Sequence, residues 1–476
     1  MERRITADRT AVLIGGAVDR PPAYLSIAET LRMLIADGRI PPETRLPSER
    51  ELTGALGVSR TTVTRAYSLL RDSGHLVSRQ GSGSVTQLPS SAHVGDLLLN
   101  PEPARAGRID LTCASPTAPP GIMEAFEAAV AELPAHLPLN GYYPSGLPSL
   151  KAAIAQRYVE RGLPTEPEQV LVTSGGQAAM AVAVRAFVDR GDRVLTESPS
   201  YPNALASLRG AGARVLGADV EQRGWATSSV LDAVRQVRPA AAYLMPDFQN
   251  PTGQLMDDEE RAALAGALRR SKTLTIADET MAEIALDEVA TPLPFAAHLP
   301  DAITIGSASK AFWGGLRIGW LRAPDRRMAA LVAARLTLDL GAPVVEQLAL
   351  QHLMSRREEV LRVRRRQLRE SRAALVAALA AELPDWRFRV PAGGLSLWCE
   401  LPRPVSSAFV VAATEHGVQL AAGPLFAPEG GLERRVRVPY TQPPATLTDA
   451  VRRLATAWQE GLPRRTAKRR APALVT

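Results

Sequence analysis

The sequence is poor in cysteine and lysine and has no long uninterrupted apolar run. Its 476 residues include two cysteines, Cys113 and Cys399, which are too few for a disulfide framework or a cysteine metal cluster. No apolar run approaches the ~20 residues of a membrane-spanning helix, and the first residues lack the apolar stretch of a signal peptide. We therefore expect no membrane segment, no metal site and a reducing, cytoplasmic environment.

Lysine is also rare in this sequence. Of 56 basic residues only four are lysines: Lys151, Lys272, Lys310 and Lys468. A genome-wide preference for arginine codons would explain this bias without any function. A position that keeps lysine is nonetheless of interest, because arginine cannot form a Schiff base with a carbonyl compound.

The net charge of +7 is only weak support for nucleic-acid binding, because it is unevenly distributed. Residues 463–476 contain five basic residues and no acid, and we expect this tail to be disordered. Residues 1–90 contain twelve arginines against nine acids, an excess of only three. A DNA-binding function must therefore depend on where individual side chains lie.

Residues 15–87 have the pattern of one small helical domain. Apolar residues at helical spacing follow Ile27, and Ser48 with Glu51 forms an S-x-x-E capping box for a second helix. Ser59 can begin a third helix, and two β-prone runs around a glycine-rich turn come next. Three helices followed by a hairpin are typical of a winged helix-turn-helix domain.

The remainder of the chain has an α/β pattern. Residues 88–107 are rich in proline, serine and alanine and are expected to form a linker. Between 108 and 462, helical stretches alternate with β-prone runs, which indicates a mainly parallel sheet with helices on both faces. We expect a long, very basic helix around 347–381 and a smaller α+β lobe from about 382 to 460. The β-prone runs are 170–173, 193–198, 242–245, 274–278 and 303–307.

The start of the third helix is suited to reading DNA. The first turns of a recognition helix reach base edges and phosphates in the major groove. Arginine can bind guanine through two N–H groups, and threonine can contact a phosphate or a thymine methyl. A charged, solvated helix face is the alternative for any single residue. The candidates are Arg45, Arg50, Arg60, Thr61, Thr62 and Arg65, with Gln80 and Gly81 in the hairpin turn.

Residues 41–85, PPETRLPSERELTGALGVSRTTVTRAYSLLRDSGHLVSRQGSGSV, closely resemble the winged-helix domain of GntR-type regulators. The resemblance covers most of residues 21–86. It implies that the positions matching Arg50, Arg60, Thr61, Gln80 and Gly81 contact operator DNA.

In the second half, five ends of β-prone runs carry polar groups, and ligands of open α/β sheets lie beyond the carboxyl ends of the strands. Free N–H groups at a helix start can bind phosphate, and a lysine amine can react with a carbonyl cofactor. Taken singly, each feature is also explained by an ordinary turn, a core tyrosine, a helix cap or a surface lysine. The five segments are Ser174–Gln177, Glu197–Tyr201, Asn250–Gly253, Asp278, and Ser307–Lys310 with Arg317.

The order S-G-G-Q, aromatic, N-P-x-G, D, S-x-S-K, R resembles fold-type I pyridoxal-phosphate (PLP) enzymes of the aspartate aminotransferase group, over roughly residues 108–460. The resemblance implies that Lys310 forms the PLP aldimine, that Asp278 pairs with the pyridine nitrogen and that Asn250 binds the ring oxygen. It places the phosphate among Gly176, Gln177, Ser307, Ser309 and Arg317. It also assigns Tyr201 to ring stacking, Tyr142 to the partner subunit's phosphate and Arg437 to an effector carboxylate.

Together the two halves resemble the MocR subfamily of GntR regulators. This resemblance implies a homodimeric, PLP-dependent transcription regulator in the cytoplasm, at the nucleoid, which binds operator DNA and senses PLP or an amine or amino-acid effector. Where relatives carry a tyrosine after the strand-end aspartate, this chain has Thr280 or Met281. Losing that phenol favours sensing over turnover. An active aminotransferase with an accessory DNA-binding domain is the alternative, and a cofactor-free dimerisation scaffold is the third reading.

Overall fold

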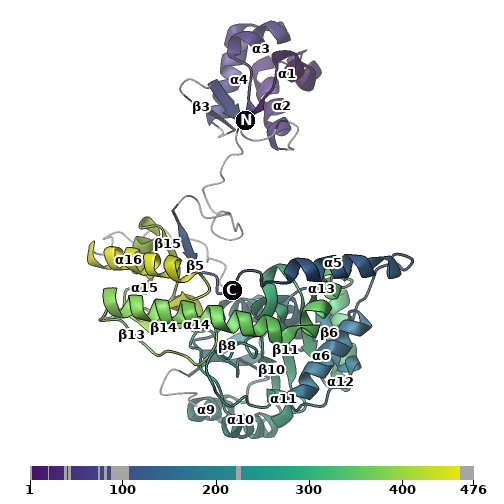
Figure 1. The fold of residues 1–476 in the computed structure, drawn as a ribbon, viewed down its shortest axis with the longest axis vertical. Helices are drawn as coiled ribbons and strands as arrows, with labels where there is room; N and C mark the ends of the chain where they lie inside the picture. Colours follow the sequence, from purple (N-terminus) through teal and green to yellow (C-terminus); the bar gives the residue numbers. More distant parts are fainter. Residues whose placement is uncertain are drawn as a thin grey trace. The chain divides into compact units, whose positions relative to one another are not determined.

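The computed structural model describes residues 3–19, 21–36, 40, 44–72, 75–79, 83–86, 107–220 and 227–460. The chain divides into two compact units, Met1–Asn100 and Pro101–Thr476 (Figure 1). In the described part of the chain, no helix is long and apolar enough to cross a membrane.

The first unit has helices packed on one apolar core and a small sheet. The helices are α1 (Ala7–Ile14), α2 (Ala23–Ala36), α3 (Glu49–Leu56) and α4 (Arg60–Asp72), with a short 3-10 turn at Gly15–Asp19. The sheet has the spatial order β1 (Arg3–Arg4), β2 (Thr44–Arg45), β4 (Gly83–Thr86) and β3 (Leu76–Arg79). Strands β1 and β2 and helix α1 were not expected from the sequence, and α1 adds the buried Ile14 to the core.

Local signals set the ends of α3 and α4. The predicted capping box is confirmed, since Ser48 Oγ accepts from Glu51 N and the Glu51 carboxylate accepts from Ser48 N. Helix α3 ends at Gly57, whose φ of +67° lies in the left-handed region that favours glycine. Ser59 Oγ accepts from Thr62 N at 3.1 Å and so starts α4. These two boundaries fix where α4 begins.

The second unit is built on a seven-stranded sheet. Strand β12 is antiparallel to both of its neighbours, and the other pairs are parallel. All five expected β-runs form strands of this sheet, the third beginning one residue earlier than expected; β8 and β12 were not anticipated. The spatial order is β6 (Val170–Thr173), β12 (Gly319–Arg322), β11 (Ile303–Ser307), β10 (Leu274–Asp278), β9 (Ala241–Leu244), β7 (Arg193–Ser198) and β8 (Arg214–Asp219).

Helices cover both faces of this sheet. Because side chains alternate along a strand, Val170 and Val172 of β6 join one apolar core while Leu171 joins another. The first core includes α5 (Ile122–Glu132), α6 (Pro148–Glu160), α9 (Thr227–Val237), α10 (Asp258–Arg270), α11 (Phe295–His298) and α13 (Val344–Ser355). The second includes α7 (Gly176–Phe187), α8 (Pro202–Gly210) and α12 (Asp325–Leu336).

The expectation of one long helix around 347–381 was wrong, because α13 and α14 (Arg357–Glu382) meet at a non-helical Arg356 with φ −110° and ψ 22°. No proline or glycine marks this break in the sequence. Helix α14 contributes Leu361 to the sheet's core and Leu375 to the core of the C-terminal lobe, so it spans both (Figure 1).

The C-terminal lobe has a five-stranded sheet of its own, with two helices packed on it. Its first strand, β5, comes from the beginning of the unit and pairs in parallel with β15. The spatial order is β13 (Arg387–Phe388), β14 (Ser396–Glu400), β16 (Arg435–Pro439), β15 (Val418–Ala422) and β5 (Ile109–Leu111), and the helices are α15 (Ser406–Glu415) and α16 (Pro444–Glu460).

Candidate cofactor site and DNA-binding face

Lys310 lies just beyond the sheet. Strand β11 ends at Ser307, and the chain then forms a single π-helical turn, Ser309–Trp313, that carries Lys310. Such turns are frequent at functional sites. The half-buried Lys310 points its amine back toward the start of the unit, where Nζ donates to Ala114 O at 3.0 Å.

The loop that follows β5 gathers several of the predicted side chains. Ala114 O accepts from Lys310, and Thr112 O accepts from the guanidinium of Arg437 on β16. Arg437 Nη1 also donates to Asn250 Oδ1 at 3.2 Å. An amine and a guanidinium from separate parts of the sequence therefore meet at one loop, and the amide of Asn250 joins them through Arg437.

Arg437 is fully buried, with its guanidinium carbon 5.2 Å from the centre of the Phe426 ring. Burial lowers the pKa of Arg437 to about 10, so its charge persists at neutral pH. The two nearby arginines lie elsewhere: Arg434 donates to Pro402 O, and Arg435 pairs with Glu400. Arg437 is thus the arginine of this group that lies at the site and can bind a carboxylate.

Asp278 ends β10 as a buried acid with 6% exposure. Tyr243 Oη donates to its Oδ2 at 2.7 Å, and Thr280 N donates to its Oδ1 at 3.0 Å. Burial raises the pKa of Asp278, while these two donors act in the opposite direction. Its carboxylate keeps acceptor positions for a further N–H group, which a protonated pyridine ring can provide.

Tyr243 was missed by the sequence analysis. It lies in β9, is fully buried and directs its hydroxyl at the carboxylate of Asp278. The sequence signal that could have revealed it is a tyrosine within a strand otherwise made of alanine and leucine. A buried tyrosine hydroxyl requires a hydrogen-bond partner, so such a residue indicates a polar group nearby.

A cradle for an anion lies at the start of α7. Gly175 precedes this helix with φ +95°, and Arg317 Nη2 donates to Ser174 O at 3.3 Å. The positive φ of Gly175 favours glycine there, and a Cβ on Gly176 would lie 3.3 Å from Ser307 Cβ, which is a tight contact. The N–H groups of a helix start, the Arg317 guanidinium and the Ser307 hydroxyl together suit a phosphate group.

Other predicted side chains are placed around this cradle. Ser307 Oγ lies 3.1 Å from Ser309 Oγ. Gln177 turns its side chain away, with Nε2 donating to Ser207 Oγ at 2.8 Å, so only its backbone N–H faces the helix start. Tyr201 is half-buried at the start of α8; burial raises the pKa of its hydroxyl to about 12, so it stays protonated.

Two expected positions do not join the site. Tyr142 is 61% exposed, and in the described part of one chain it has no hydrogen bond to the other site residues. The resemblance places a tyrosine where this chain has Thr280 or Met281, and Met281 is buried in the core of the C-terminal lobe. No phenol therefore reaches the site from this segment.

The amine of Lys310 is tuned by its surroundings. Burial is the main cause that lowers its pKa to about 8, with Arg437 and Arg317 acting in the same direction and Cys113 and Asp278 opposing them. An ordinary lysine has a pKa of 10.5. Near neutral pH, a far larger fraction of Lys310 than of an ordinary lysine is therefore the neutral, nucleophilic amine.

The first unit presents an exposed arginine surface around the start of α4. Arg50 and Arg60 are exposed, and neither has a hydrogen bond or ion pair among the described residues. Thr61 is exposed as well and has only a long contact of 3.4 Å from Ser59 Oγ to its hydroxyl, whereas Thr62 Oγ1 lies 2.8 Å from Ser59 Oγ and belongs to the helix start. These contacts leave Arg50, Arg60 and Thr61 available to a ligand.

The remaining DNA candidates differ from one another. Arg65 lies 4.1 Å above the centre of the Tyr24 ring, which gives it a packing role within the unit. Arg45 is half-buried on β2. Gln80 and Gly81 lie outside the described residues.

A further residue, Glu49, was not anticipated: it accepts from Thr64 Oγ1 at 2.6 Å and so joins α3 to α4.

Each of the two units matches a known protein family. Residues 23–85 match the family of bacterial regulatory proteins of the gntR type, and residues 117–454 match aminotransferase class I and II. The chain is 32% identical over 330 residues to a 2-aminoadipate transaminase of Thermus thermophilus, covering 67% of this chain and 80% of that protein. It is 31% identical over 399 residues to a probable rhizopine catabolism regulatory protein, MocR, of Rhizobium meliloti, covering 77% and 78%.

One similar solved structure contains a compound derived from PLP. The α-aminoadipate aminotransferase LysN from Thermus thermophilus, complexed with a phosphopyridoxyl-leucine, aligns with a TM-score of 0.69 and 30% identity, covering 74% of this chain and 92% of that one. The residues described above fit PLP, since the glycine cradle suits its phosphate, Asp278 its pyridine nitrogen and Lys310 its aldehyde. The chain therefore belongs to the aminotransferase class I and II family and, through its gntR-type first unit, to the MocR subfamily of PLP-dependent, DNA-binding transcription regulators.

Proposed function

We propose that the second unit is a sensor that holds PLP and receives an effector carrying a primary amine and a carboxylate. The observation that carries this proposal is the meeting of Lys310 and Arg437 at the Thr112–Ala114 loop, with Asn250 bound to Arg437. The proposal places the regulator at chromosomal DNA in the cytoplasm, where effector binding changes operator affinity.

Each proposed role follows from the chemistry of the residue. When bound, PLP supplies an aldehyde that condenses with primary amines. The α7 start, Ser307, Ser309 and Arg317 hold the phosphate, Asp278 holds the ring nitrogen and Asn250 binds the ring oxygen. Arg437 orients the effector's carboxylate. Tyr243 is a positioning residue, because it fixes the carboxylate of Asp278 through the 2.7 Å hydrogen bond.

We also propose that the regulator is a homodimer in which Tyr142 reaches the phosphate of the partner subunit. The support is an exposed phenol and exposed apolar side chains in the same stretch of chain, residues 123–142. Met123 is 64% exposed, Leu137 69% and Leu139 60%. Two recognition helices would then read paired half-sites on the operator.

Coupling to DNA requires that the effector bind one conformation of the protein better than another. The test measures operator binding by the PLP-loaded protein across a panel of amines and amino acids, with the promoter fragment of the protein's own gene as probe. At least one member of the panel is expected to change the affinity. If neither free PLP nor any compound of the panel changes the operator affinity, the proposed sensor function is wrong.

Arg437 tests the carboxylate part of this proposal. Arg437→Met is expected to abolish the response to an α-amino acid while keeping the response to the corresponding amine without a carboxylate. The matched control is Arg434→Met, which removes an exposed arginine that contacts Pro402 O outside the site. Equal responses to the acid and the amine in the wild-type protein would contradict the assigned role.

A pH profile tests the state of Lys310. The rate at which the cofactor-free protein takes up PLP is expected to rise with pH and to level off above the Lys310 pKa of about 8, since only the neutral amine has a free lone pair. A profile that keeps rising toward the ordinary lysine pKa of 10.5 would show that burial does not depress the pKa. Lys151→Ala, on α6, is the control and should leave the profile unchanged.

A transaminase activity is the second candidate function. It is supported by the 32% identity to a 2-aminoadipate transaminase. Against it, neither Thr280 nor Met281 supplies the tuning phenol that the resemblance places after Asp278. Steady formation of a keto acid from an amino donor would favour the enzyme over the sensor.

A further inference from the structure

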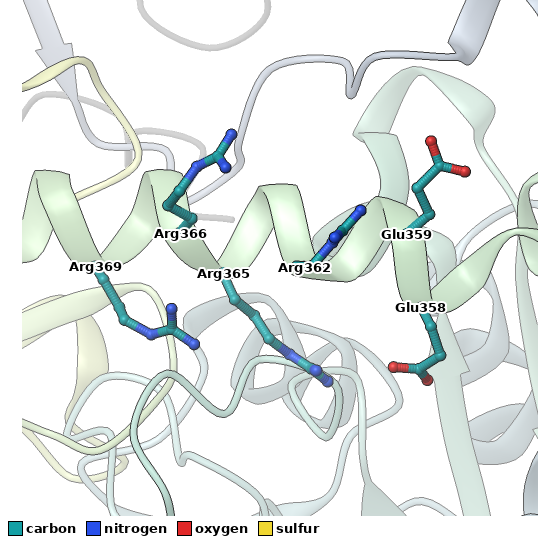
Figure 2. Close-up of a pocket in the computed structure, with 6 residues that line it drawn as sticks. All are labelled: Glu358, Glu359, Arg362, Arg365, Arg366 and Arg369. Carbon is teal, nitrogen blue, oxygen red and sulfur yellow. The ribbon is translucent and has the colours of Figure 1, made fainter.

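The N-terminal half of α14 carries a concentration of positive charge that the cofactor site does not use. Between Val360 and Arg372 the sequence contains six arginines and a single acid, Glu370. Arg364 is buried and donates to Phe312 O, and Arg372 pairs with Asp287. The other four border an open groove of about 580 Å³ along the helix (Figure 2): Arg362, Arg365, Arg366 and Arg369. We call these four residues the α14 arginine face.

The glutamates that line the groove, and the nearby Glu283, are already paired with other arginines, which leaves the exposed Glu370 as the one acid within this stretch of the helix. Glu358 and Glu359 lie at one end of the groove (Figure 2). Glu359 accepts two hydrogen bonds from Arg356, at 3.1 and 3.0 Å, and Glu358 accepts two from Arg357, at 3.2 and 3.1 Å. Glu283, 3.8 Å from Arg365, is also bound by Arg157. The charge of the α14 arginine face is therefore largely uncompensated.

Two arginines of this face are held by hydrogen bonds to backbone carbonyl groups, and the other two are exposed. Arg365 donates through Nε to Glu283 O at 3.1 Å, and Arg369 donates through Nε to Leu286 O. Arg362 and Arg366 are exposed and have no hydrogen bond or ion pair in the described part of the chain. Side chains four apart on a helix lie roughly 5–6 Å from each other. Such a row suits a polyanion with closely spaced charges.

We infer that the α14 arginine face contacts the phosphate backbone of double-stranded DNA. Guanidinium groups bind phosphates through paired N–H donors, and a duplex carries about one charge per 1.7 Å of axis. The inference rests on DNA binding by the first unit, because DNA held by one part of the chain is at a raised effective concentration for the other. Contacts of this kind carry no base preference.

An acidic protein segment is the competing partner. The groove is lined by arginine and glutamate alone, without an apolar side chain. Protein interfaces usually have an apolar centre, whereas DNA interfaces are strongly basic and polar. The composition of the groove thus favours DNA.

The salt dependence of DNA binding tests this inference in the full-length, PLP-loaded protein. The probe is a labelled duplex of mixed sequence and ~60 bp, long enough to pass beyond one binding site. The variant is Arg362→Gln with Arg366→Gln. The matched control, Arg193→Gln with Arg214→Gln, removes the same charge from exposed arginines at the starts of β7 and β8. A third protein, Arg50→Gln with Arg60→Gln, removes the two exposed charges around the start of α4 in the first unit.

The slope of log affinity against log salt concentration is expected to fall in magnitude by about 1.8 in the α14 variant, at roughly 0.9 per lost phosphate contact, and to stay unchanged in the control. An unchanged slope in the α14 variant, with a reduced slope in the Arg50 and Arg60 variant, overturns the inference while DNA binding by the first unit stands. Equal losses in the α14 variant and the control also overturn it, since they indicate general charge alone. Weakened binding of poly-glutamate without any change in DNA binding would assign the surface to an acidic protein.

Discussion

Replacing Lys310 with alanine is expected to remove all covalently trapped pyridoxyl label from the protein. In the wild-type protein, reduction with borohydride after loading with PLP should leave the label on the peptide that contains Lys310. The physical reason is the amine's position near Asp278, Arg437 and Arg317, together with a pKa lowered to about 8. Peptide mapping is clean here because the chain has only four lysines.

The other lysines supply the controls. Lys151→Ala and Lys272→Ala should keep the label on the Lys310 peptide and the absorbance of the PLP-loaded protein. Lys310→Ala loses one hydrogen bond, to Ala114 O, which costs about 1 kcal/mol of stability, so the variant should fold and still bind DNA. Label on another lysine in the wild-type protein would remove Lys310 from its assigned role, and an unfolded Lys310→Ala variant would make the residue structural.

Much of the fold was predictable because its signals are local. The capping box joins Ser48 and Glu51, which are only three positions apart in the sequence, and it forms as expected. The β-prone runs of the large sheet are short, apolar and bounded by turns, and each becomes a strand. The break between α13 and α14 could not be read, because Arg356 carries no helix-breaking side chain.

The candidate site was predictable in its side chains and less so in its contacts. Lys310 and Asp278 stand at strand ends, where parallel topology brings them together. The carbonyl groups of Ala114 and Thr112 could not be found, since every residue has a carbonyl and these two meet partners 196 and 325 positions away. The direction of the Gln177 side chain depends likewise on α8, which folds against it.

Arg60→Ala is expected to weaken operator binding by about 1–3 kcal/mol, a factor of roughly 5 to 150, if the side chain reads a base edge. Arg60 is the first residue of α4, and it is exposed and without a partner among the described residues. It is thus free to enter the major groove, and removing it disturbs no contact within the described part of the first unit. The measurement is a titration of the promoter fragment at one fixed salt concentration, because phosphate contacts vary with salt.

Base reading and phosphate contact by Arg60 give different results in the same titration. A base contact predicts that Arg60→Ala loses affinity for the promoter fragment and retains affinity for a mixed-sequence duplex, so the ratio of the two falls. A phosphate contact lowers both affinities equally and reduces the salt slope by about 0.9. The matched control is Arg9→Ala on α1, an exposed arginine without a side-chain partner among the described residues, which should change neither affinity. An unchanged ratio for Arg60→Ala would leave sequence recognition to Arg50 and Thr61 on the same surface.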